Sequence, residues 1–123
     1  MNFTSKPVWL LICGLLGASG VALGAVAAHA LADPTAAIAV GRASNYQLLH
    51  AIALLVLSQM VGSLTVLARA AMLAGILGFS GAIYLKYLLG RTGAGIVAPW
   101  GGSLLILSWL LVAASALTAS KEA

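Results

Sequence analysis

Charged side chains are scarce in this chain of 123 residues: only 7% are Asp, Glu, Lys or Arg, while 63% are hydrophobic. Soluble domains usually carry about 25% charged residues, so the scarcity excludes an ordinary water-soluble domain. The net charge of +4 comes from six basic residues that stand singly along the chain. A phosphate groove needs a clustered basic patch, so we expect no nucleic-acid partner and interpret these residues as anchors at helix ends.

Acidic residues, cysteines and histidines are also scarce, and each shortage removes a class of chemistry. The two acidic residues, Asp33 and Glu122, lie outside the charge-free stretches, whereas a proton-coupled drug antiporter typically needs a carboxylate within the membrane. The single cysteine, Cys13, cannot form an internal disulfide. Two histidines fall short of the three or four ligands that zinc prefers. With no paired carboxylates and no Ser-His-Asp set, we expect no enzyme activity, no metal and no cofactor.

What the chain does have is long stretches without charge. Four stretches lack Lys, Arg, Asp and Glu: residues 7–32, 43–68, 70–85 and 92–120. A helix needs about 20 apolar residues to cross a bilayer, and the third stretch reaches this length if Lys86 extends to the interface. The sequence therefore predicts an integral membrane protein whose partners include membrane lipids.

The predicted fold class is all-α, a transmembrane four-helix bundle of antiparallel up-down hairpins in a single domain. The spans are expected at about 7–31, 45–68, 70–89 and 102–120. Asp33-Pro34 is expected to cap a short helix over 34–41, which Gly41 breaks. Basic residues divide three to three between the two sides, so the positive-inside rule predicts no orientation: Lys6, Arg69 and Lys121 against Arg42, Lys86 and Arg91.

Small residues share one face on two of the predicted helices. The first helix carries such a face within about 120°, and the third carries a second one. In lipid, small residues let two helix backbones approach closely. We expect them to pack helices within the chain, with homodimerisation or a membrane-protein partner as the alternative. The predicted packing glycines are Gly14, Gly17, Gly20 and Gly24 in the first helix, with Gly75 and Gly78 in the third.

A polar stripe on the second predicted span is expected to face the bundle interior, since unpaired polar groups are costly in hydrocarbon. Its members are Gln47, His50, Ser58 and Thr65. His29 is expected to end the first span and His50 to lie just inside the second, which would place both near one membrane surface. The candidate polar cluster at that surface comprises His29, Asn45, Tyr46, Gln47 and His50.

Three interpretations of this cluster are open. It could be a hydrogen-bonded plug that holds helix ends together. It could be a site for a small molecule, a lipid headgroup or a proton, because imidazole titrates near neutral pH. Finally, bis-histidine haem ligation needs only the two histidines, His29 and His50.

Several motifs occur together in a fixed order over most of the chain. They are Gly24-Ala25-Val26-Ala27-Ala28-His29-Ala30-Leu31, Tyr46-Gln47-Leu48-Leu49-His50-Ala51, Phe79-Ser80-Gly81-Ala82-Ile83-Tyr84 and Pro99-Trp100-Gly101-Gly102. This set resembles the small four-helix membrane proteins of the YgdD/YwdK type, a family of unknown function. Val26 and Ala27 stand where that family usually has Phe and Gly. The resemblance implies a bacterial plasma (inner) membrane protein and implies no activity.

We therefore expect a non-enzymatic membrane protein, either an accessory subunit or a binder of lipid or another apolar ligand. The alternative is a small channel or transporter that uses His29 and His50. A transporter needs a continuous polar path through the bundle, and this requirement separates the two hypotheses.

Overall fold

The structure, a computed structural model, describes residues 6–122, with side chains up to Thr118, and all regular elements in this range are helical. The all-α prediction is therefore confirmed. In chain order the elements are α1 (Pro7–His29), α2 (Pro34–Leu57), α3 (Ser63–Ile76), η1 (Leu77–Gly81), α4 (Ala82–Leu88), η2 (Thr92–Ile96) and α5 (Ala98–Glu122). Because α3, η1 and α4 run on without a break, they form one long helix with a π-helical segment inside it.

Local signals explain where the first three helices begin. Pro7 occupies the first turn of α1, where its missing N–H costs no hydrogen bond. The Asp33 carboxylate caps α2 by accepting the backbone N–H groups of Thr35 and Ala36, both at 3.4 Å. Gly62, which precedes α3, has φ 119°, a conformation that residues with a Cβ rarely adopt.

The predicted boundary between the second and third spans is wrong. The sequence predicted a short helix over 34–41 and a span over 45–68, but α2 runs unbroken from Pro34 to Leu57 and the turn falls at 58–62. Gly41 does not break α2, because a glycine inside a helix costs only about 1 kcal/mol. The third span, expected over 70–89, starts at Ser63, so Arg69 lies inside α3 and does not mark a connection.

Three helical segments are long and apolar enough to cross a membrane among the described residues: Pro7–His29, Ser63–Leu88 and Thr92–Thr118. The sequence predicted four such spans. α2 has the length but not the composition, because it carries Arg42 together with Asn45, Gln47 and His50. The polar character of α2 has a structural counterpart, since this helix has the most buried residues, Gln47 and His50 among them.

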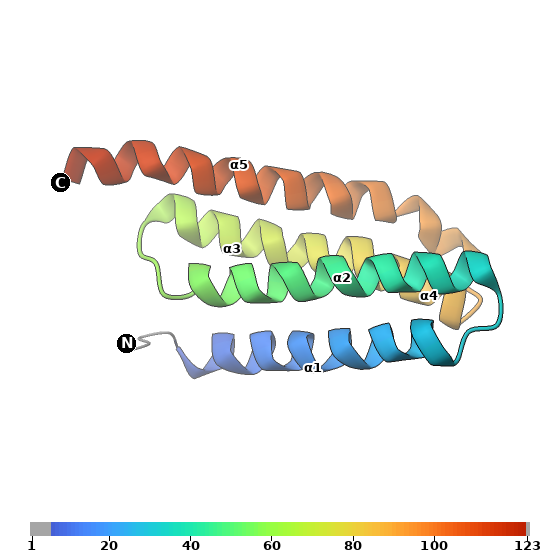
Figure 1. The fold of residues 1–123 in the computed structure, drawn as a ribbon. Coiled ribbons are helices and arrows are strands. Elements are labelled where there is room, and N and C mark those ends of the chain that lie inside the picture. The colour runs from blue at the N-terminus through green and yellow to red at the C-terminus, as the bar shows by residue number, and fades with distance from the viewer. Residues whose placement is uncertain (1–5, 123) are drawn as a thin grey trace.

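The helices lie side by side, with α2 in contact with α1 on one flank and with α3, η1 and α4 on the other (Figure 1). α5 packs mainly against α3. The start of α1, the α2–α3 turn and the end of α5 lie at one end of the molecule. The apolar core joins four helices near that end and comprises Cys13, Leu54, Leu57, Ala68, Met72, Ile76 and Leu105. Large apolar side chains cover much of the outside, including Leu11, Leu15, Val21, Leu110 and Leu117.

Glycines set the closest approach between α3 and α5. A Cβ at Gly75 would lie 2.9 Å from the backbone nitrogen of Leu105, and one at Gly78 would lie 3.0 Å from the Cα of Gly101. A Cβ at Gly101 would collide with the backbone of Gly78 and Phe79. The two long helices therefore touch backbone to backbone at this crossing.

The predicted glycine face of α1 divides into two parts. Gly20 lies against Leu48 and Gly24 lies against Ser44, both on α2. At Gly14 and Gly17, in contrast, an added Cβ would meet nothing within 4 Å, so these two do not pack within the chain as predicted. The reason is that α1 packs mainly against α2, and Gly14 and Gly17 lie outside this contact. Homodimerisation through the open part stays a prediction.

Candidate functional site

Gln47, almost fully buried on α2, connects three helices through its side-chain amide. Its Nε2 donates to the Leu16 carbonyl at 2.8 Å and to Ser19 Oγ at 2.7 Å, both on α1. The Tyr84 hydroxyl of α4 donates to Gln47 Oε1 at 2.7 Å. Both the oxygen and the nitrogen of the amide thus have partners, and these bonds fix the rotation of α2 against α1 and α4.

Ser80 adds a second polar contact between α2 and the third long helix. It lies in the π-helical segment η1, is buried, and donates to the Ala43 carbonyl at 2.8 Å. Extra residues in a π turn change which side chains face a neighbouring helix. Ser80 in this segment and Tyr84 in the α4 helix that follows it both reach α2, where their hydroxyls donate to the Ala43 carbonyl and to Gln47 Oε1.

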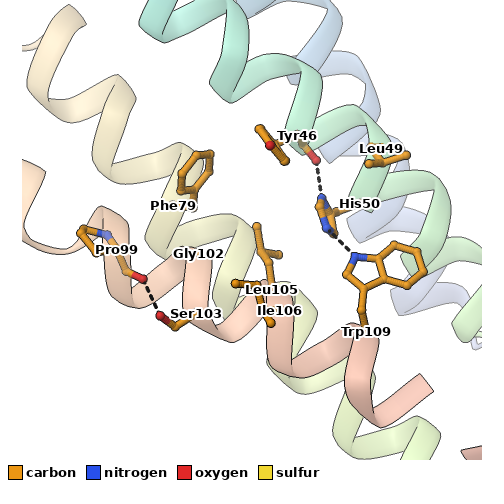
Figure 2. Close-up of a pocket in the computed structure, with 10 residues that line it drawn as sticks. All are labelled: Tyr46, Leu49, His50, Phe79, Pro99, Gly102, Ser103, Leu105, Ile106 and Trp109. Carbon is orange, nitrogen blue, oxygen red and sulfur yellow. Dashed lines mark hydrogen bonds between the residues drawn. The ribbon is translucent and has the colours of Figure 1, made fainter. Parts of the chain in front are cut away.

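His50 connects α2 to α5. The indole Nε1 of Trp109 donates to His50 Nε2 at 2.9 Å, and His50 Nδ1 lies 2.7 Å from the Tyr46 carbonyl (Figure 2). An indole N–H can only donate, so Nε2 is the acceptor and the ring proton sits on Nδ1, which donates to Tyr46. The imidazole is therefore neutral, it is 2% exposed, and both of its nitrogens have partners.

A crevice of about 430 Å³ lies beside this histidine, between α2, η1 and α5 (Figure 2). Tyr46 packs edge-on against Phe79, with ring centroids 5.3 Å apart, and the His50 and Trp109 rings meet at 5.8 Å. The crevice opens sideways, because lining residues such as Tyr46, Ile106 and Trp109 are exposed. Its walls are mostly apolar and aromatic: Tyr46, Leu49, His50, Phe79, Pro99, Gly102, Ser103, Leu105, Ile106 and Trp109.

The structure does not keep the predicted polar cluster together. His29 ends α1 and is exposed, while His50 lies about 24 Å along α2 from Pro34. Their predicted meeting at one surface is wrong, because it rested on a second span that started at Asn45. Asn45 is exposed, and Gln47 faces α1 and α4. Of the five residues in the predicted cluster, only Tyr46 and His50 line the crevice.

These positions do not suit bis-histidine haem ligation. His50 already uses both ring nitrogens, and His29, at the end of α1, does not line the crevice beside His50. Within residues 6–122, no group of three or more His, Cys, Asp or Glu side chains could hold a metal ion.

Sequence reasoning missed two partners of the polar stripe. Neither Trp109 nor Ser19 was among the predicted site residues, yet Trp109 bonds His50 and Ser19 bonds Gln47. The pairs are 59 and 28 residues apart in the chain, so no local pattern could have joined them. The inward direction of Gln47 and His50 on α2 was predictable, and both are buried. Ser58 and Thr65 are buried too, but the predicted stripe does not continue to them on one helix, because Ser58 caps the end of α2 and Thr65 lies on α3.

The two histidines are expected to respond differently to replacement by alanine. His50→Ala removes two hydrogen bonds and leaves a void, so it should lower the free energy of unfolding by about 2–3 kcal/mol. His29→Ala should change it by less than about 0.5 kcal/mol, because the side chain is exposed. Unfolding by SDS in mixed micelles, followed by circular dichroism, measures both. Equal losses would contradict the bonding described for His50.

Comparison with known proteins agrees with this picture of a membrane protein. The sequence model of a family described as "Protein of unknown function (DUF423)" matches residues 23–102. The chain is 30% identical to a UPF0382 membrane protein of Staphylococcus epidermidis over 111 residues, 85% of this chain and 91% of that protein. It is 32% identical to a UPF0382 membrane protein of Staphylococcus aureus over 74 residues, 58% of this chain and 61% of that protein. No solved structure matches the chain.

Proposed function

Because the chain belongs to the DUF423 family of membrane proteins of unknown function, we propose that it is a non-enzymatic protein that binds an apolar ligand within the membrane. The binding site is the crevice between α2 and α5. The ligand is an aliphatic or aromatic molecule with one hydrogen-bonding group, which pairs with the hydroxyl of Tyr46 or Ser103. The protein acts as an accessory subunit or carrier that presents this ligand to another membrane component.

The crevice beside His50 is the observation that carries this proposal. Its volume of about 430 Å³ falls in the range of small-molecule sites, roughly 300–1,000 Å³. Apolar walls with a few convergent polar groups are typical of such sites. The opening faces sideways past exposed Tyr46 and Ile106, the direction from which a molecule dissolved in lipid would enter.

The membrane setting is part of the same proposal. We propose that the chain lies in the bacterial inner membrane as an antiparallel four-helix bundle and that it is of the YgdD/YwdK type. α2 crosses with the other helices although it is less apolar, because its buried polar groups bond within the protein and need no contact with lipid.

A photoreactive fatty acid tests the crevice directly. Full-length protein in lipid nanodiscs is labelled with a diazirine analogue of palmitic acid, and the labelled peptides are mapped by mass spectrometry. We expect labels on α2 and α5 around Tyr46 and Ile106. Ile106→Trp fills the crevice and should lower this labelling about tenfold, the factor that 1.4 kcal/mol of lost binding produces.

Leu107→Trp is the matched control, because Leu107 neighbours Ile106 on α5, is exposed, and does not line the crevice. Its labelling should equal that of the unmodified protein. Labels spread evenly over all apolar helix faces, or equal labelling of the two tryptophan variants, would refute a ligand site in the crevice.

The transporter alternative has less support. It relies on His29 and His50 acting along one path, and the structure offers no observation that favours this. Solute or ion flux through proteoliposomes that is abolished by His50→Ala and kept by Asn45→Ala would nevertheless establish it.

A further inference from the structure

Arg69 is an arginine inside a long apolar helix, two turns into α3, with its charge only partly compensated. Its guanidinium lies over the Trp9 ring, 5.5 Å from the centroid. Nη1 makes long hydrogen bonds to two carbonyls at the end of α2, 3.5 Å to Leu57 and 3.4 Å to Ser58. Nε is buried and has no hydrogen-bond partner. Such a group within a membrane segment is a candidate functional site.

No carboxylate balances this charge among the described side chains, which end at Thr118. Asp33 is the one acidic residue in that range, and it caps the opposite end of α2. α2 rises about 36 Å over its 24 residues, so Asp33 is far from the guanidinium. Lys6 lines the same cavities as Arg69 and adds a second positive charge. The two positive charges together favour the binding of an anion beside them.

Two cavities meet at Arg69, and they differ in character. One, of about 290 Å³, lies at the α2–α3 turn beside Ser58 and Gly62, at the end of the molecule where α1 starts. The other, of about 620 Å³, follows α3 inward past Leu73, Ala74 and Leu77. Lys6, Trp9, Val66 and Arg69 line both. A cationic compartment at the molecule's end therefore continues into an apolar groove.

We propose that this continuous site between α1 and α3 binds an anionic glycerophospholipid. The lipid phosphate lies against the guanidinium of Arg69 and the ammonium of Lys6, and one acyl chain follows the groove along α3. Arginine suits this role because its planar fork can give a phosphate two parallel hydrogen bonds.

The cationic compartment and the apolar groove lie at the membrane depths that the headgroup and the acyl chain of a lipid would occupy. Lys6 is the N-cap residue of α1 and Trp9 lies in its first turn, where basic and aromatic residues meet the membrane interface. From Arg69 to Leu77 the helix rises about 12 Å toward the membrane centre. A headgroup at Arg69 thus leads its chain past Leu73 and Leu77. A free inorganic anion would use the cationic compartment and leave the groove empty.

Native mass spectrometry of full-length protein, released from mixed micelles that contain equal phosphatidylglycerol and phosphatidylcholine, tests the proposal. The unmodified protein should retain phosphatidylglycerol in clear preference. Arg69→Gln should lower the phosphatidylglycerol-bound fraction about tenfold, because charge-assisted hydrogen bonds are lost. Arg42→Gln is the matched control on α2 and should leave retention unchanged. Arg69→Lys should have an intermediate effect.

A second variant tests the groove without touching the charge. Ala74→Trp fills the apolar groove and should also lower phosphatidylglycerol retention. If Arg69→Gln fails to fold, Ala74→Trp and Arg69→Lys test the proposal in its place. Equal retention of the two lipids by the unmodified protein would overturn the proposal. Full displacement of the lipid by millimolar inorganic phosphate would assign the cationic compartment to a free anion and overturn it as well.

Discussion

Replacing Gly101 by alanine is expected to lower the free energy of unfolding by about 3 kcal/mol, the upper part of the usual range for overpacking. The added methyl group would collide with the backbone of Gly78 and Phe79 on the neighbouring helix. A flexible side chain could move aside, but two helix backbones cannot, so α5 must shift away from η1. The shift would also loosen the contact of Gly75 with Leu105. SDS-induced unfolding followed by circular dichroism provides the measurement.

Gly14→Ala is the matched control for this prediction, since it makes the same change in another helix. A Cβ at Gly14 meets nothing within 4 Å. Alanine there should be neutral or should stabilise α1 by about 0.5–1 kcal/mol, because glycine is the poorer helix former. If Gly101→Ala proved as stable as Gly14→Ala, η1 and α5 would not approach as closely as described.

Gln47→Leu is expected to lower the free energy of unfolding by about 2 kcal/mol. The substitution removes three hydrogen bonds and leaves the hydroxyls of Ser19 and Tyr84 without this partner. Hydrogen bonds between membrane helices contribute about 0.6 kcal/mol on average and up to about 1.7 kcal/mol. Asn45→Leu is the control, because Asn45 is exposed two residues earlier on the same helix, and it should change stability by less than about 0.5 kcal/mol.

A double-mutant cycle with Tyr84→Phe separates the bond between Tyr84 and Gln47 from the effect of changed side-chain shape. If the hydroxyl acts through Gln47, the double variant should lose less stability than the sum of the single losses, by about 1 kcal/mol. Strictly additive losses would mean that Tyr84 stabilises the protein independently of Gln47.

The α2–α3 boundary shows why charge-free stretches alone misplace helix ends. A charged residue normally marks the edge of a membrane span, and by this logic Arg69 would end the second one. Its side chain is long enough to reach from inside α3 to the carbonyls at the end of α2. The true signal was Gly62, whose positive φ makes the turn. The position of Arg69 in the sequence therefore does not reveal the end of α2, which is set by the backbone conformation of Gly62.

The part of the candidate site that lies on α2 was predictable from the sequence. Periodicity placed Gln47 and His50 on the face that avoids lipid, and both are buried. It could not place Trp109 opposite His50, because that pairing depends on how α5 is rotated and how far it slides along α3. His29 was assigned to the same cluster only because α2 was started too late.

The amino-acid order by itself determined that most of this chain belongs in hydrocarbon and that it folds into helices. Both properties follow from local composition, since transfer into lipid and backbone hydrogen bonding act on each segment separately. Only the tertiary structure decided which polar groups meet and where crevices remain. Those outcomes depend on the rotation and spacing of neighbouring helices, which glycine contacts such as Gly78 with Gly101 set over long distances in the chain.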